Sequence, residues 1–184
     1  MTAASQARDL QIVERHRYGD DSAFEEVYAH HAEMVFNLSW RLSGNRDQAS
    51  DLTQEVFLRV FRHLAKFRGG ASLKTWIYRI ALNHCRSELG RTRLPAVSDD
   101  EETLGRLPDP RRSPEERAAA EDAGRQVAKA LGGLPRRFRE AVVLRDLEGL
   151  TYLEIAEVTG VRVGTVRSRL ARGRERLRRI LENT

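Results

Sequence analysis

The sequence predicts an all-α protein with two small helical domains joined by a flexible acidic linker, the C-terminal domain being a helix-turn-helix. Three observations support this fold class. Apolar residues recur at helical spacing in both halves of the chain, and no run alternates as a strand does. Residues 95–115 hold four of the five prolines and show neither pattern, which is typical of a linker. A length of 184 residues leaves room for two small domains, 1–94 and 116–184.

The first domain is expected to contain four helices. Ser22 and Glu25 have the Ser-x-x-Glu spacing of a capping box, in which each side chain satisfies a free backbone N–H group, so we expect a helix to begin at Ser22. A Gly-Gly break precedes Ser72, whose hydroxyl is well placed to cap the last helix. The predicted helices are residues 8–17, a second from residue 22 onward, 47–67 and 72–89.

The second domain is predicted to end in a helix-turn-helix. Thr151 and Glu154 have the capping-box spacing at the start of a short helix. Gly160 suits the turn that follows, because glycine tolerates a positive φ, and the apolar pattern restarts at Val163. Two helices are expected before this motif, residues 116–131 and 135–147.

The last helix combines an apolar stripe with a basic face. The stretch VGTVRSRLARGRERLRR, residues 163–179, contains seven arginines and one acidic residue. Small and apolar residues lie at i, i+4, i+7 and i+11, on one side of a helix: Val166, Leu170, Gly173 and Leu177. A solvated basic tail would not need an apolar stripe, because it has no core to face. The stripe favours a helix-turn-helix, and an ordinary helical hairpin remains the alternative. A helix-turn-helix would present the basic face to the major groove of DNA.

The charge distribution favours a polyanionic partner. The chain has a net charge of +5, with 14 basic and 11 acidic residues in 1–94 and 12 and 7 in 134–184, whereas residues 95–122 have 4 and 9. The single cysteine, Cys85, rules out an internal disulfide, which suits a protein of a reducing compartment. Its side chain is expected to be buried. No apolar signal segment or run of 18 apolar residues occurs, so we expect a cytoplasmic protein without membrane insertion.

The third predicted helix carries two stripes. Its core stripe is Leu52, Val56, Val60 and Leu64, and an acidic stripe runs beside it at the same spacing: Asp47, Asp51 and Glu55. Like charges at i, i+4 repel each other, and an acidic face would also repel DNA. A basic protein surface is therefore one candidate partner for this face, and a simply solvated face is the alternative.

The fourth predicted helix has a core face and a mixed polar face. The core face is Leu73, Trp76, Ile77, Ile80, Ala81 and His84, which leaves these residues pointing elsewhere: Lys74, Tyr78, Arg79, Asn83 and Arg86. Cations, an aromatic ring and an amide are the groups that bind single-stranded bases and their phosphates. An ordinary surface helix would have a similar composition.

Several motifs together resemble those of one family. DLTQEVFLRVFRHLAKFRG followed by TWIYRIALN is similar to the second domain of bacterial RNA polymerase sigma factors of the extracytoplasmic-function (ECF) group. LPRRFREAVVLRDLEGLTYLEIAEVTGVRVGTVRSRLARGRERLR is similar to their fourth domain. The resemblance covers nearly the whole chain. It implies a transcription initiation factor that binds core polymerase, recognises the −10 and −35 promoter elements and helps to open the duplex.

The resemblance also implies three sets of site residues. For the clamp helices of the polymerase's largest subunit it indicates Asp51, Gln54, Glu55 and Phe57. For the −10 element, including a base flipped from the non-template strand, it indicates Phe67, Arg68, Ser72, Trp76, Arg79 and Asn83. For the −35 element it indicates Thr165, Arg167, Ser168, Ala171, Arg172 and Arg174. Ala171 departs from larger side chains in the family, so the −35 bases are not predicted.

The implied partners are core polymerase, through its clamp helices and flap region, promoter DNA and an anti-sigma factor. The linker resembles those that run through the RNA exit path, and in the free protein we expect the two domains to tumble semi-independently. A one-component helix-turn-helix regulator is the alternative function. No catalytic residue or cofactor is expected. No metal site is expected either, because His30 and His31 diverge on a helix and with Glu33 give no ligand set.

Overall fold

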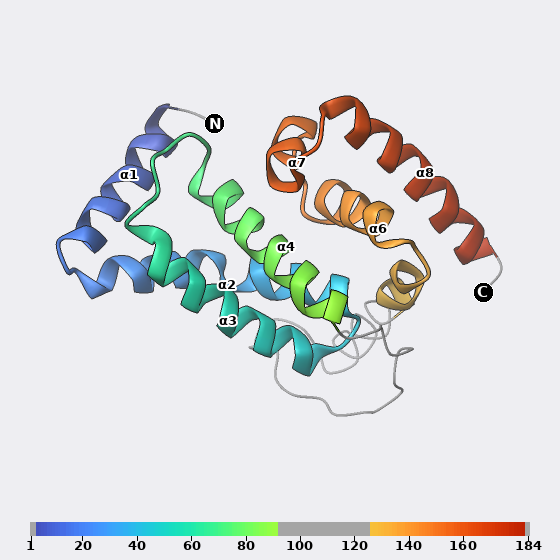
Figure 1. Cartoon of the computed structure of the whole chain (residues 1–184), viewed down its shortest axis with the longest axis horizontal. Coiled ribbons are helices and arrows are strands. Elements are labelled where there is room, and N and C mark those ends of the chain that lie inside the picture. Colours follow the sequence, from blue (N-terminus) through green and yellow to red (C-terminus); the bar gives the residue numbers. More distant parts are fainter. Residues whose placement is uncertain (1–2, 92–125, 183–184) are drawn as a thin grey trace, which may run out of the picture.

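A computed structural model describes residues 3–91 and 126–182, and within these ranges every regular element is helical and no strand occurs. The all-α fold class is confirmed. Figure 1 shows the first domain packed beside the second. The first domain consists of α1 (Ala3–Arg17), α2 (Asp21–Ser43), α3 (Arg46–Leu64) and α4 (Leu73–Arg91). The second has helical residues 126–132, then α6 (Arg136–Val142), a π-helix η1 (Val143–Leu147), α7 (Tyr152–Thr159) and α8 (Val163–Glu182).

The predicted linker, residues 95–115, lies outside the described residues, as does most of the helix predicted for 116–131. The predicted helix 135–147 is present in two parts, because the α-helix passes into the π-helix η1 after Val142.

Local caps explain where the helices of the first domain begin. The predicted capping box at Ser22 and Glu25 is wrong. Asp20 is the N-cap of α2, and its carboxylate accepts from the Ser22 backbone N–H at 3.0 Å, so the helix starts one residue earlier. The prediction for α4 is confirmed, because the Ser72 hydroxyl accepts from the Thr75 N–H at 3.0 Å.

The core of the first domain follows the predicted stripes. The stripe of α3 is buried along its whole length, and it packs against α2 and α4, with His84 and Cys85 buried as well. The acidic stripe of α3 faces solvent: Asp47, Asp51 and Glu55. The apolar spacing thus determined which face of α3 turns inward.

Two residues of α4 were expected on its outer face, and the structure corrects both. Tyr78 is 1% exposed, and its hydroxyl donates to a carboxylate oxygen of Glu148 in the second domain at 2.7 Å. Arg86 donates two hydrogen bonds, of 2.8 and 2.7 Å, to the carboxylate of Glu140. The reason is the packing of the second domain on this face, with α7 against α4. Burial, together with the nearby Glu148, raises the pKa of Tyr78, so the phenol remains a donor.

Ion pairs and hydrogen bonds cross the interface between the two domains. The side chains of Glu140 and Glu148 are only 4% and 7% exposed, and Arg41 of α2 also pairs with Glu148. Arg139 donates from α6 to the carbonyl oxygen of Leu42, near the end of α2, at 2.8 Å. Buried charges of this kind are tolerated only when partners satisfy them. The described residues thus bring the two domains into contact, and their semi-independent movement in the free protein stays a prediction.

The interface predicts that Glu148→Ala loosens the contact between the domains. The substitution removes the acceptor of Tyr78 and the partner of Arg41, which should weaken the contact by about 1–3 kcal/mol. Small-angle scattering should then show a larger radius of gyration than for the wild-type protein.

The matched control is Asp146→Ala, which removes an ion pair to Arg174 inside the second domain. It should leave the radius of gyration unchanged. Wild-type scattering from the Glu148 variant would show that this carboxylate does not hold the domains together.

Candidate nucleic-acid interface

The helix-turn-helix has the caps and the turn predicted for it. The Thr151 hydroxyl accepts from the Glu154 N–H at 3.2 Å, and the Glu154 carboxylate accepts from the Thr151 N–H at 2.8 Å. Gly160 caps the end of α7 with a φ of 73°. These local bonds fix the direction in which the chain enters α8.

One side of α8 is seated closely on α6. Val166, Leu170 and Gly173 are buried, as the stripe predicted, and Leu177 packs at the edge of the core. A Cβ atom at Gly173 would lie 2.8 Å from Val142 Cγ2 and 3.2 Å from the carbonyl oxygen of Phe138. Only glycine permits this approach, which turns the opposite face of α8 outward.

All four α8 arginines that follow Arg172 have partners within the chain. Arg174 forms two hydrogen bonds to Asp146, of 2.9 and 2.5 Å, and Arg178 and Arg179 both pair with Glu175. The Arg176 guanidinium lies 5.4 Å from the centre of the Phe138 ring. These contacts reduce the charge repulsion among the arginines of the helix. They also distinguish the later arginines, which have partners within the chain, from the outward-facing arginines nearer the start of α8.

The structure places four of the six predicted −35 residues on the exposed face of α8: Arg167, Ser168, Ala171 and Arg172. Thr165 is partly buried in the first turn, and Arg174 is turned toward Asp146. Arg167 also lies 5.9 Å from the centre of the Tyr152 ring of α7. The face is basic and belongs to a single helix, and a major groove admits one α-helix.

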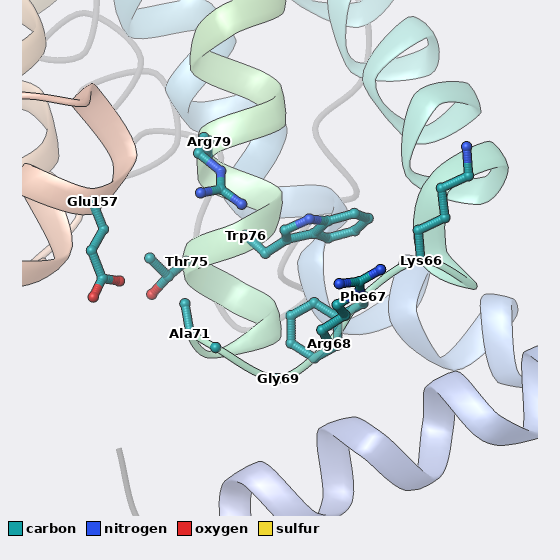
Figure 2. A pocket seen from close by; sticks show the side chains of 10 residues that line it. Lys66, Phe67, Arg68, Gly69, Ala71, Thr75, Trp76, Arg79 and Glu157 are labelled. Carbon is teal, nitrogen blue, oxygen red and sulfur yellow. The ribbon is translucent and has the colours of Figure 1, made fainter.

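A pocket of about 450 Å³ lies at the start of α4 and in the loop before it. Figure 2 shows Phe67 and Trp76 side by side, their ring centres 5.6 Å apart and their planes tilted by 68°. Its lining is Lys66, Phe67, Arg68, Gly69, Gly70, Ala71, Thr75, Trp76, Arg79 and Glu157. The pocket therefore brings together four of the six predicted −10 residues, with Ser72 acting as a cap. Asn83 is exposed further along α4 and outside the lining.

The pocket combines aromatic rings with three cations, Lys66, Arg68 and Arg79. Such a site suits a stacked base with a phosphate nearby. Glu157 lines it from α7, as Figure 2 shows. The presence of Glu157 at the pocket could not be predicted from the sequence, because it results from the packing of the two domains.

A second surface, on α3, has the composition of a protein-binding site. Asp51, Gln54 and Glu55 are exposed, and a Glu55 oxygen lies 2.8 Å from Nε2 of the buried His84. Phe57 is only 4% exposed, so this side chain supports the surface from inside.

The rings around Phe57 belong to α2. Its ring centre lies 4.7 Å from that of Tyr28 and 6.4 Å from that of Phe24. Next to them, Leu58 and Phe61 expose 56% and 45% of their surface. We did not predict these two residues as part of the site, although their place off the core stripe was a signal. Large apolar side chains that are exposed side by side are typical of a protein interface.

In the part of the chain that the structure describes, no helix is long and apolar enough to span a membrane. The same residues hold no group of three His, Cys, Asp or Glu side chains that could bind a metal ion. His30, for its part, lies with Nδ1 2.8 Å from the carbonyl oxygen of Glu26 one turn earlier in α2.

Comparison with protein families gives two matches. Residues 27–94 match the family described as Sigma-70 region 2, and residues 124–177 match Sigma-70, region 4. The first match covers α3, α4 and most of α2, and the second covers the helix-turn-helix. Apart from Glu157, the pocket lining falls in the first matched region, and the exposed face of α8 falls in the second.

Similar proteins include three curated sigma factors. ECF RNA polymerase sigma factor SigE of Mycolicibacterium smegmatis is 42% identical over 166 residues, a match that covers 87% of this chain and 63% of that protein. RNA polymerase sigma-H factor of Pseudomonas aeruginosa is 36% identical, covering 97% and 96%. ECF RNA polymerase sigma-E factor of Escherichia coli K12 is also 36% identical, covering 94% and 93%.

Two solved structures have a similar fold. The structure of CnrH in complex with the cytosolic domain of CnrY has a TM-score of 0.73 at 25% identity, covering 98% of this chain and 99% of that chain. The sigma factor RpoE of Bartonella quintana, in complex with the anti-sigma factor NepR, has a TM-score of 0.66 at 27% identity, covering 86% and 96%.

The seating of α8 predicts that Gly173→Ala destabilises the second domain. The new methyl group would meet Val142 and the Phe138 carbonyl, and overpacking of this kind costs about 1–3 kcal/mol. Urea unfolding should show a lower midpoint.

Gly164→Ala is the matched control, because nothing lies within 4 Å of a Cβ at that position of the same helix. It should be neutral or stabilising. Equal midpoints for the two variants would contradict the close approach of α8 to α6.

Proposed function

The chain belongs to the ECF group of the sigma-70 family, and we propose on this basis that it binds core RNA polymerase and directs it to promoters. The observation that carries the proposal is the presence of two separate cationic sites in one chain, a basic helix face on α8 and a cationic aromatic pocket beside α4. A promoter has two recognised elements, −10 and −35, and the chain offers one site on each domain, one for each element.

Recognition of the −35 element is assigned to the exposed face of α8. Arg172 lies on this face, away from the buried stripe and before the arginines that pair with Glu175. Its guanidinium can donate two hydrogen bonds to one guanine edge. Arg167 and Ser168 lie one turn earlier and would reach neighbouring bases or phosphates. Arg174 is assigned a supporting contact, because Asp146 already accepts from it.

Capture of a −10 base is assigned to the pocket before α4. Trp76 offers a stacking surface, and Phe67, which is only 3% exposed, supports the Trp76 ring. Arg68 and Arg79 offer cations for the flanking phosphates. Asn83 stands exposed further along the helix, where its amide can both donate to and accept from a base edge. We assign it to a base edge of the −10 element outside the pocket.

Binding of core polymerase is assigned to the exposed face of α3. Asp51, Gln54 and Glu55 would meet a basic surface of the clamp helices, while Leu58 and Phe61 supply apolar area. The flap region of the polymerase is the proposed partner of the second domain. Since these partners act where the chromosome is transcribed, we also propose a cytoplasmic location.

An anti-sigma factor is a further proposed partner. RpoE of Bartonella quintana was solved with the anti-sigma factor NepR, and CnrH with the cytosolic domain of CnrY. In the present chain the two domains already contact each other, and Glu157 of the second domain lines the pocket of the first. A partner that binds both domains at once would stabilise this closed arrangement and keep the pocket from DNA.

The proposal predicts selective initiation in a reconstituted reaction. Core polymerase with the protein should start transcription at a defined set of genomic promoters, and core polymerase alone should not. Asp51→Lys should lower the affinity for core polymerase at least tenfold, about 1.4 kcal/mol, because it places a cation against a basic surface.

Glu14→Lys is the charge-matched control on the exposed face of α1 and should bind polymerase normally. The proposal fails if the wild-type protein gives no promoter selectivity. If Asp51→Lys binds normally, the α3 face is not the polymerase site.

The α8 face predicts different results for Arg172→Ala and Arg179→Ala. Loss of Arg172 should cost about 1–3 kcal/mol and flatten the preference at one or two −35 positions. Loss of Arg179 should weaken all promoters slightly, because this side chain is paired with Glu175 beyond the reading face. Binding to a −35 substitution series at two salt concentrations distinguishes the two effects. A uniform loss for Arg172→Ala would assign it to phosphate instead.

A further inference from the structure

The N-terminal helix α1 forms hydrogen bonds to both ends of the pocket loop, residues 65–72. Arg17 donates to the carbonyl oxygens of Ala65 and Phe67, at 2.7 and 3.0 Å. Gln6 donates to the carbonyl oxygen of Gly69 at 2.8 Å. All these acceptors are main-chain atoms, so the bonds fix the path of the loop whatever side chains it carries.

A fourth bond fixes the point where the loop enters α4. The Asp9 carboxylate accepts from the Leu73 N–H at 2.8 Å, which is one of the free donors in the first turn of that helix. Leu10 packs against Gly69, where a Cβ atom would lie 3.1 Å from Leu10 Cδ2 and where φ is 72°. The loop therefore needs a glycine at this point, and α1 occupies the space beside it.

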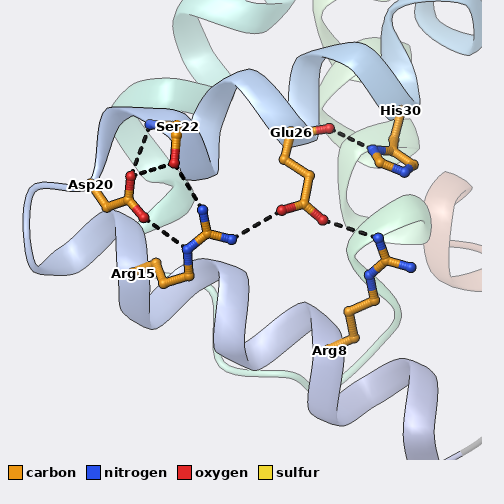
Figure 3. A network of polar contacts seen from close by, with 6 residues as sticks. All are labelled: Arg8, Arg15, Asp20, Ser22, Glu26 and His30. Atoms are coloured by element: carbon orange, nitrogen blue, oxygen red, sulfur yellow. Dashed lines mark hydrogen bonds and ion pairs between the residues drawn. The ribbon is translucent and has the colours of Figure 1, made fainter.

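The other side of α1 is anchored to α2. Figure 3 shows Arg15 between Asp20 and Glu26, with nitrogen–oxygen distances of 2.8 and 3.0 Å, and Arg8 on the second oxygen of Glu26 at 3.0 Å. Hydrogen bonds from Arg8 and Arg15 lower the pKa of Glu26, so the anchor is retained well below neutral pH. Ile12 and Val13 are buried in the core beneath it.

We propose that Gln6, Asp9 and Arg17 are positioning residues for −10 base capture, which hold loop 65–72 in the shape that keeps the pocket open. The proposal rests on the function assigned to the pocket. None of the three side chains lines the pocket, and they act only through main-chain atoms of the loop. A loop already held in its binding shape loses less conformational entropy when a base enters.

The role has a specific signature. Without α1's bonds the loop samples more shapes, so base capture and promoter opening weaken while binding to core polymerase and to the −35 element stays normal. Discrimination between the correct and incorrect −10 base should fall as well, because a looser pocket accepts more bases. A purely structural role would lower thermal stability and affect all of these activities together.

The test compares Asp9→Ala with Asp9→Asn, since asparagine keeps an acceptor oxygen for the Leu73 N–H. With core polymerase, Asp9→Ala should reduce permanganate reactivity of the −10 thymines about tenfold at unchanged polymerase affinity. Asp9→Asn should restore most of it. Arg17→Ala against Arg17→Lys repeats the comparison at an exposed residue, where folding is not at risk.

A second readout needs no DNA. The chain has two tryptophans, so Trp40→Phe leaves Trp76, which lies against Phe67 in the pocket, as the only reporter. In this background Asp9→Ala and Arg17→Ala should increase acrylamide quenching of Trp76, and Asp9→Asn should not.

Unchanged quenching and unchanged opening in the alanine variants would overturn the proposal. An asparagine variant as impaired as the alanine variant would overturn it too, because the acceptor would then be irrelevant. If the wild-type protein itself opened no promoter, the assigned function of the pocket would fail, whereas the quenching result would still report on whether α1 holds the loop.

Discussion

Two buried carboxylates determine how the domains of this protein are arranged. Glu140 and Glu148 belong to the second domain, yet their partners Arg86, Arg41 and Tyr78 belong to the first. A buried carboxylate is costly without its hydrogen-bond donors. These pairs therefore favour one particular alignment of the two domains, in which each carboxylate meets its donors. The burial of Tyr78 and the presence of Glu157 in the pocket both follow from that alignment.

Features that depend on neighbouring residues could be predicted from the sequence. The caps at Ser72 and Thr151 and the turn at Gly160 involve partners within four positions, and they are confirmed. The buried faces of α3 and α8 were also predicted, because apolar periodicity reports which side turns inward. The start of α2 was misplaced because the charged carboxylate of Asp20, two positions before Ser22, serves as the N-cap in place of the Ser22 capping box.

Features that depend on distant partners could not be predicted. Tyr78 and Arg86 look like surface residues in the periodic pattern, because their partners lie 70 and 54 positions away. Family resemblance indicated the position of Phe57 but not its burial, and it indicated Arg174 but not the Asp146 beside it. The contacts of α1 with the loop were missed for the same reason, since Gln6 and Gly69 are 63 positions apart.

The division of α8 into two faces also has an evolutionary consequence. The residues that hold the helix in place, such as Leu170 and Gly173, are different from Ser168, Ala171 and Arg172, which face outward. After gene duplication, the outward residues are free to mutate without loss of folding, so daughter copies can diverge toward separate regulons. Gly173, in contrast, is expected to stay invariant among them, because its constraint comes from the scaffold that all copies share.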